Sequence, residues 1–146
     1  MNKTILLIIL LLSGNSKETE TGFSLESTSI PQFIKGKFID DYGIQYTISD
    51  SLWIQHPNAK YHIIRYSEKE QYLIARNDDK NSSDPGLYSR IDLMPFEGME
   101  PWKWGFCLSV YNAKSDSAAE NGYKADKSNP RKGCNGFPFS RMKSSN

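Results

Sequence analysis

Hydrophobic and polar residues alternate along much of the chain after residue 36, and this period of two is typical of strands with one buried face. Ile44, Tyr46 and Ile48, for example, are separated by Gln45 and Thr47. Turn-forming residues bound each run and predict strands at residues 37–39, 44–48, 52–55, 61–66, 71–76, 87–94 and 102–111. Short connections between them predict a mainly β domain, an antiparallel meander closed into a small barrel or folded as a sandwich.

The predicted strand at residues 102–111 has the clearest division into two faces. Its apolar face comprises Trp102, Trp104, Phe106, Leu108 and Val110. Pleating should direct this face to the interior, and Cys107, which has the opposite parity, to the outer side. A short helix is expected near residues 113–121, because Ser117-Ala118-Ala119-Glu120 precedes Asn121-Gly122, a pair typical of a helix C-terminus.

The first sixteen residues predict a secretory leader, or signal peptide. A basic start at Lys3 is followed by an apolar run at residues 5–12 and by small polar residues up to Ser16. The run is too short to span a bilayer, which takes about 20 apolar residues, so the chain is not expected to be transmembrane. We expect export to the periplasm or the medium, with cleavage after Ser16.

The end of the leader also bears on lipid anchoring. Leu12-Ser13-Gly14 is how bacterial lipoprotein leaders end, but Asn15 stands where the lipid-bearing cysteine would be. Without a thiol there can be no thioether to a lipid, so a lipid anchor is not expected. Residues 17–35 are rich in Ser, Thr and Glu and predict a flexible linker, which leaves residues 36–146 as a single domain.

Composition and charge change this picture little. The 8 Tyr, 7 Phe and 3 Trp favour strands over helices. Cleavage after Ser16 would leave 17 basic and 17 acidic residues, so no nucleic-acid partner is expected. Residues 121–146, however, hold six basic residues and one acidic residue, whereas residues 36–120 hold nine and thirteen. We therefore expect the basic C-terminal segment to pack against the acidic body of the domain.

The two cysteines, Cys107 and Cys134, are expected to form a disulfide in an oxidising compartment. The bond would clamp the C-terminal segment over the outer face of the strand at residues 102–111. A reactive thiol or a metal ligand is the alternative, but there is no Cys-x-x-Cys motif and neither cysteine has a histidine nearby in the sequence.

Metal binding has only weak candidates, and no cofactor is expected. Asp79, Asn81 and Ser83 alternate as in a calcium loop, but the closing glutamate and the central glycine are missing. A polar hairpin loop is the favoured interpretation, although Asn81-Ser82-Ser83 is also a glycosylation sequon. His56 and His62 can face each other on a hairpin, yet a third ligand is missing.

No catalytic constellation is found, and an enzyme is therefore not expected. There is no Gly-x-Ser-x-Gly motif and no Ser/His/Asp cluster. Arg90 and Asp92 share the parity opposite Ile91 and Leu93, and a cross-strand salt pair is a sufficient explanation for these two charges.

Aromatic residues provide the main indication of function. Trp53, Trp102, Trp104, Phe106 and Tyr46 can line a concave site for a small hydrophobic or sugar-like ligand, or simply form the core. The sequence Trp102-Lys103-Trp104 follows Pro101, at a strand end where a barrel mouth would lie. The alternative function is an envelope protein-interaction module, such as an inhibitor of a secreted hydrolase, that uses a rim loop at residues 77–86.

Several motifs resemble a group of small exported bacterial proteins, many of them lipoprotein-like. These motifs are YLIARND at 72–78, YSRID at 88–92, WGFC at 104–107 and GCNGF at 133–137, together with Tyr111. The resemblance covers residues 36–142 and implies export and paired cysteines, but no catalytic role. Gly36-Lys37-Phe38 also resembles the Gly-x-Trp opening of lipocalin-like barrels, with Phe38 in place of the tryptophan, and implies a small lipocalin-like barrel.

Overall fold

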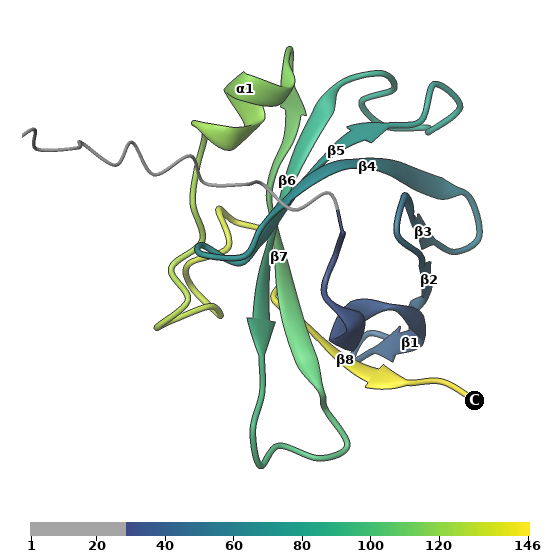
Figure 1. The fold of residues 1–146 in the computed structure, drawn as a ribbon, viewed down its shortest axis with the longest axis vertical. Coiled ribbons are helices and arrows are strands. Elements are labelled where there is room, and N and C mark those ends of the chain that lie inside the picture. Colours follow the sequence, from purple (N-terminus) through teal and green to yellow (C-terminus); the bar gives the residue numbers. More distant parts are fainter. Residues whose placement is uncertain (1–28) are drawn as a thin grey trace, which may run out of the picture.

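A computed structural model describes residues 29–146, so the predicted leader and most of the predicted linker lie outside the described residues. The described chain forms a closed antiparallel barrel in which each strand pairs with the next one (Figure 1). Its strands are β1 (Gly36–Asp40), β2 (Gln45–Ile48), β3 (Leu52–Gln55), β4 (Ala59–Ser67), β5 (Tyr72–Asn77), β6 (Tyr88–Pro95), β7 (Trp104–Ala113) and β8 (Ser140–Ser144). The predicted β class and barrel are confirmed.

Strand β8 was not predicted, although it closes the barrel by pairing with both β1 and β7. The sequence of β8 does not show the hydrophobic alternation of a strand, because Met142 is its only large apolar residue and polar residues occupy the other positions. Met142 lies opposite Asp40 on β1 and Trp104 on β7, and it is fully buried. Pairing on both sides, rather than local hydrophobicity, makes this segment a strand.

Aromatic rings that meet edge to face fill the barrel interior. Trp53 and Trp104 have 1% and 0% of their surface exposed, and their ring centroids lie 5.8 Å apart. Phe106 lies 4.9 Å from Trp53 and belongs to the same interior cluster. This part of the barrel is therefore a packed core and not a cavity.

A 3-10 helix, η1 (Gln32–Ile34), precedes β1 and packs against the end of the barrel where β1 begins. Ile30 and Ile34 are buried in the interior cluster, and the ring of Phe33 lies 6.3 Å from that of Trp104. The last residues of the segment predicted as a linker are thus packed against the domain. Two isoleucines in a polar stretch gave no periodic signal from the sequence.

The two faces of β7 differ from the prediction at both ends. Trp102 lies before the strand, in the connection from β6, and an irregular register with β6 between Arg90 and Ile91 changes the alternation near Val110. Val110 packs with Tyr72, Ile74 and Ala119 in an outer cluster instead of the interior. The expected inward positions of Trp102 and Val110 were therefore wrong, because a strict period of two does not survive a β-bulge.

The predicted helix is confirmed as α1 (Asp116–Glu120), which covers the outside of β5, β6 and β7 (Figure 1). Ser115 caps its first turn by accepting a hydrogen bond from the Ala118 amide at 3.0 Å. Arg65 on β4 fixes the helix to the barrel through Asp116 at 2.8 Å and Glu120 at 2.7 Å. No helix among residues 29–146 has the length and apolar run needed to cross a membrane.

We expect α1 to loosen from the barrel in acid. The hydrogen bond from Tyr72, and then that from Arg65, hold the pKa of Glu120 below its ordinary value of 4.5. The stabilisation from Glu120 is therefore complete above about pH 4.5 and is lost as the pH falls through the lower folded-state pKa. Urea unfolding of wild type and Glu120→Gln should differ near neutral pH and converge in acid. A difference that is the same at both pH values would contradict this expectation.

Candidate functional site

The two ends of the barrel differ, because η1 covers one end whereas a pocket of about 370 Å³ opens at the other. This mouth pocket lies where β1 ends and β2 begins. Its apolar lining residues are Ile44, Tyr46, Phe106, Leu108, Phe137 and Pro138, and its polar ones are Asp40, Tyr42, Gln55 and Ser140. A mainly apolar lining with a few polar groups is typical of sites for small molecules.

The deepest part of the mouth pocket is aromatic. Tyr46 on β2 and Phe106 on β7 meet edge to face with their centroids 5.7 Å apart, and both side chains are buried. Trp53 contacts both rings, at 6.0 Å from Tyr46 and 4.9 Å from Phe106. Because these rings hold one another in place, the pocket has a rigid floor continuous with the core.

Asp40 joins the β1–β2 turn to this floor and is only 3% exposed. Its Oδ1 accepts hydrogen bonds from the backbone amides of Tyr42 at 2.9 Å and Ile44 at 2.8 Å. Its Oδ2 accepts the hydroxyl of Tyr46 at 3.0 Å. Burial, and then the charge of Asp40, raise the pKa of Tyr46, so the phenol stays protonated and keeps this bond.

The segment before β8, through Phe137 and Pro138, and the first residue of β8, Ser140, supply one wall of the mouth pocket. The ring of Phe137 meets that of Tyr111 on β7 at 4.7 Å, and its amide donates to the carbonyl of Cys134 at 3.0 Å. The predicted disulfide between Cys107 and Cys134 is confirmed, and both cysteines are buried. The bond therefore ties this wall to the outer face of β7.

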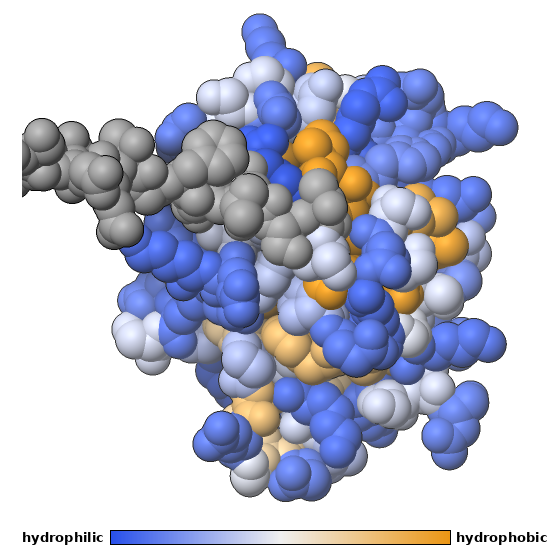
Figure 2. All heavy atoms as spheres, in the orientation of Figure 1, coloured by the Kyte–Doolittle hydropathy of each residue, from blue (hydrophilic) through white to orange (hydrophobic). Residues whose placement is uncertain are grey.

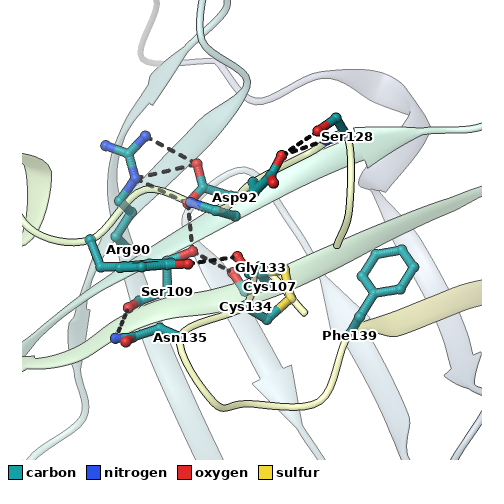
Figure 3. The surroundings of a disulfide bond; sticks show 12 residues. Arg90, Asp92, Cys107, Ser109, Ser128, Gly133, Cys134, Asn135 and Phe139 are labelled. Carbon is teal, nitrogen blue, oxygen red and sulfur yellow. Dashed lines mark hydrogen bonds and ion pairs between the residues drawn. A yellow bond between two sulfur atoms is a disulfide. The ribbon is translucent and has the colours of Figure 1, made fainter. Parts of the chain in front are cut away.

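A buried polar network lies beside the disulfide, on the outer face of β6 and β7 (Figure 3). Arg90 and Asp92 are 2% and 1% exposed and form an ion pair at 3.0 Å. Both residues belong to β6, so the pair lies within one strand and not across two strands as predicted. Asp92 also accepts hydrogen bonds from the hydroxyl of Ser109 and from the Ala125 amide at 3.1 Å. The carboxylate of Asp92 thus links two strands to the segment that follows α1.

The expected attraction between the basic C-terminal segment and the acidic body is confirmed by ion pairs. Lys124 pairs with Glu70 at 3.4 Å, and Arg141 pairs with Asp41 at 2.8 Å. These pairs are solvent-exposed or partly so, and pairs of that kind contribute little stability each. We therefore assign most of the attachment of the segment to the disulfide and to the buried network around Asp92.

The five residues predicted to bind a ligand lie in three different places. Tyr46 and Phe106 line the mouth pocket, whereas Trp53 and Trp104 lie in the core behind it. Trp102 lies before β7 and is not part of the pocket lining, and the guanidinium of Arg141 is 4.6 Å from its ring centroid. The pocket is thus not at Trp102, as the sequence suggested, but lies against Phe106 and Leu108 of the strand that follows.

The weak calcium candidates are engaged in other contacts. Asn81 pairs with the backbone of Lys60, accepting from its amide at 2.9 Å and donating to its carbonyl at 2.8 Å. Asp79 forms an ion pair with Arg76 at 2.7 Å. Asn81 is also 8% exposed, so the amide of the sequon serves to hold the loop after β5 against β4.

The two histidines do not face each other. His56 lies within hydrogen-bond distance of Thr47, at 2.9 Å, whereas His62 pairs with Asp78 at 2.7 Å. The prediction of facing histidines was wrong, because His56 contacts β2 whereas His62 contacts the loop after β5. Among residues 29–146, no group of three or more His, Cys, Asp or Glu residues is arranged to hold a metal ion.

Sequence reasoning missed several residues of the mouth pocket, among them Asp40 and Phe137. Asp40 belongs to a turn motif, Asp40-Asp41-Tyr42-Gly43, and from the sequence this motif predicts only the end of a strand. Phe137 is close in sequence to Cys134, and the disulfide was the one signal that could have placed it near β7. Comparisons of the chain with protein-family models, with curated proteins and with solved structures found no match.

Proposed function

We propose that this protein is an exported, non-catalytic binding protein that holds a small, partly apolar ligand in the mouth pocket of a lipocalin-like barrel. The observation that carries the proposal is the pocket itself, which is about 370 Å³ in volume and mainly apolar. Its floor of Tyr46 and Phe106 offers ring surface to a ligand, and Gln55 and Ser140 at its wall can orient polar groups.

Export is part of this proposal and rests on two features. The leader pattern at residues 1–16 is typical of secretion, and a buried disulfide is a common feature of proteins in oxidising compartments. A non-catalytic role is favoured because the pocket lining contains carboxylate, amide and hydroxyl groups but no histidine or cysteine that could act as a base or a nucleophile beside them.

The interaction module remains the alternative proposal, with fewer observations in its favour. The large apolar side chains that are most exposed, Phe33, Tyr42, Ile64, Met99 and Tyr123, belong to five different segments. The face shown in Figure 2 is mainly hydrophilic, with small hydrophobic areas among the charged side chains. The loop at residues 77–86, which would form the rim of such a module, is mostly polar.

Native mass spectrometry of the protein purified from its own host is the test of the proposed function. We expect a retained small molecule, whereas a retained protein would support the alternative and an empty monomer would count against both. The variant Ile44→Ser should lower the bound fraction roughly fivefold to tenfold, because Ile44 lines the pocket.

The matched control is Ile64→Ser, which makes the same chemical change at an exposed position of β4 outside the pocket lining. This variant should retain as much ligand as wild type. Equal loss in both variants would indicate that binding does not occur in the mouth pocket.

A further inference from the structure

We propose that the mouth pocket selects a ligand with a protonated amine joined to an apolar body, with the ammonium group bound at Asp40 and the body against Phe106 and Leu108. This inference rests on the proposed function and names the chemical class of its ligand. It follows from the charge and hydrogen bonding of Asp40, the charges around the pocket and the rings that line it.

Asp40 is an acidic group in an apolar setting, 3% exposed and part of the pocket lining. Its three hydrogen bonds come from the amides of Tyr42 and Ile44 and from the hydroxyl of Tyr46. A carboxylate has room for about four hydrogen bonds, so one acceptor position remains, on Oδ2. A ligand N–H group can fill that position.

The charge of Asp40 has no counterion among residues 29–146. None of the ion pairs formed by these residues includes Asp40. The neighbouring Asp41 differs in this respect, since it pairs with Arg141 at 2.8 Å. No basic residue lines the mouth pocket. Burial of a carboxylate without a counterion is costly, and a cationic ligand would supply the missing charge.

Aromatic rings make the same pocket suitable for a cation. Tyr42, Tyr46, Phe106 and Phe137 all line it, and ring faces attract an ammonium group most strongly where water is excluded. An anionic ligand would instead meet the like charge of Asp40 without a basic residue of the lining to offset it. Arg131 and Arg141 line a neighbouring surface hollow, which shares Tyr42 and Pro138 with the mouth pocket.

The test compares three probes of similar shape with the full chain at neutral pH: 2-phenylethylamine, 2-phenylethanol and 3-phenylpropionate. Affinities are measured by NMR titration, with the amides of Tyr42 and Ile44 as local reporters because both donate to Asp40. We expect the amine to bind at least tenfold more tightly than the alcohol, and the carboxylate to bind most weakly.

Two variants separate the charge of Asp40 from its structural role. Asp40→Asn can still accept both amide bonds and can donate to Tyr46, so it should fold and reduce the preference for the amine to less than about twofold. Asp41→Asn removes the same charge from the adjacent residue outside the pocket lining and should keep the preference. If Asp40→Asn does not fold, the affinities of the three probes for wild type decide whether the pocket prefers an amine.

The outcomes distinguish this inference from the proposed function. If the amine and the alcohol bind equally well, or Asp40→Asn keeps the preference, the assignment to an amine is wrong while ligand binding stands. If none of the three probes shifts resonances of pocket residues, the result counts against both.

Discussion

Replacement of Asp92 by alanine is expected to lower the free energy of unfolding by about 3 to 5 kcal/mol, the largest effect of a single substitution that we predict. The change leaves the guanidinium of Arg90 buried without its nearest carboxylate partner, and only Glu70, at 3.9 Å, remains within ion-pair distance among the described residues. Arg90 would keep its hydrogen bond to the Glu120 carbonyl at 2.9 Å and its position 3.7 Å above the ring of Tyr72. Neither of these two groups carries a charge, and the carboxylate of Glu70 is farther away, half-exposed and shared with Lys124, so most of the cost remains.

Urea unfolding followed by the fluorescence of the buried Trp53 and Trp104 measures this effect. Asp79→Ala is the matched control, because Asp79 forms an exposed ion pair with Arg76 and its loss should barely move the unfolding midpoint. A loss below about 1 kcal/mol for Asp92→Ala would show that the buried pair does not hold the C-terminal segment.

A double variant tests the mechanism of that loss. Arg90→Met removes the stranded charge, so the combination of Arg90→Met with Asp92→Ala should be more stable than the sum of the two single losses implies. We expect the interaction energy to exceed about 1 kcal/mol. Additive losses would indicate that the two side chains contribute separately and not as a pair.

Removal of the disulfide is expected to cost about 3.5 kcal/mol, the chain-entropy value for a loop of this length. The bond joins cysteines 27 residues apart, and alanine suits both positions because Cys107 and Cys134 are buried among apolar side chains. Unfolding of Cys107→Ala/Cys134→Ala in urea, compared with wild type, measures the loss. The reductant dithiothreitol should destabilise wild type similarly and leave the double variant unchanged.

The same double variant should also loosen one wall of the mouth pocket. Phe137 and Pro138 belong to that wall and follow Cys134 closely, so hydrogen exchange should become faster in this segment than in the core strands. Labelling of free thiols in the unreduced wild type should modify neither cysteine. A double variant as stable as wild type would contradict the expected role of the bond.

Local chemistry allowed much of the fold to be predicted. Alternation marked β2 and β4 because each has one face toward the interior, and turn residues marked the ends of most other strands. The disulfide was predictable because the chain has two cysteines and a leader pattern. Strand β8 and η1 were not predicted. Polar residues dominate β8, η1 is only three residues long, and both are defined by pairing or packing with distant elements.

The candidate site was less predictable than the fold. Sequence reasoning selected five aromatic residues, and the structure brings only Tyr46 and Phe106 to the mouth pocket. Trp53 and Trp104 are aromatic and face the interior like Tyr46 and Phe106, but they lie deeper in the barrel and do not line the pocket. Composition cannot report depth along the barrel axis, because this depends on strand stagger across the closed sheet.

The sequence by itself determined the β class, the outward position of Cys107 and the disulfide. The first two follow from residue type and from a period of two within one segment, and the disulfide follows from the presence of two cysteines and a leader pattern. Only the tertiary structure decided which end of the barrel is open, that Val110 faces outward, and that Asp40 meets Tyr46 and Phe137 in one pocket. Those features depend on register shifts, on closure by β8 and on contacts between distant segments, which no local pattern encodes.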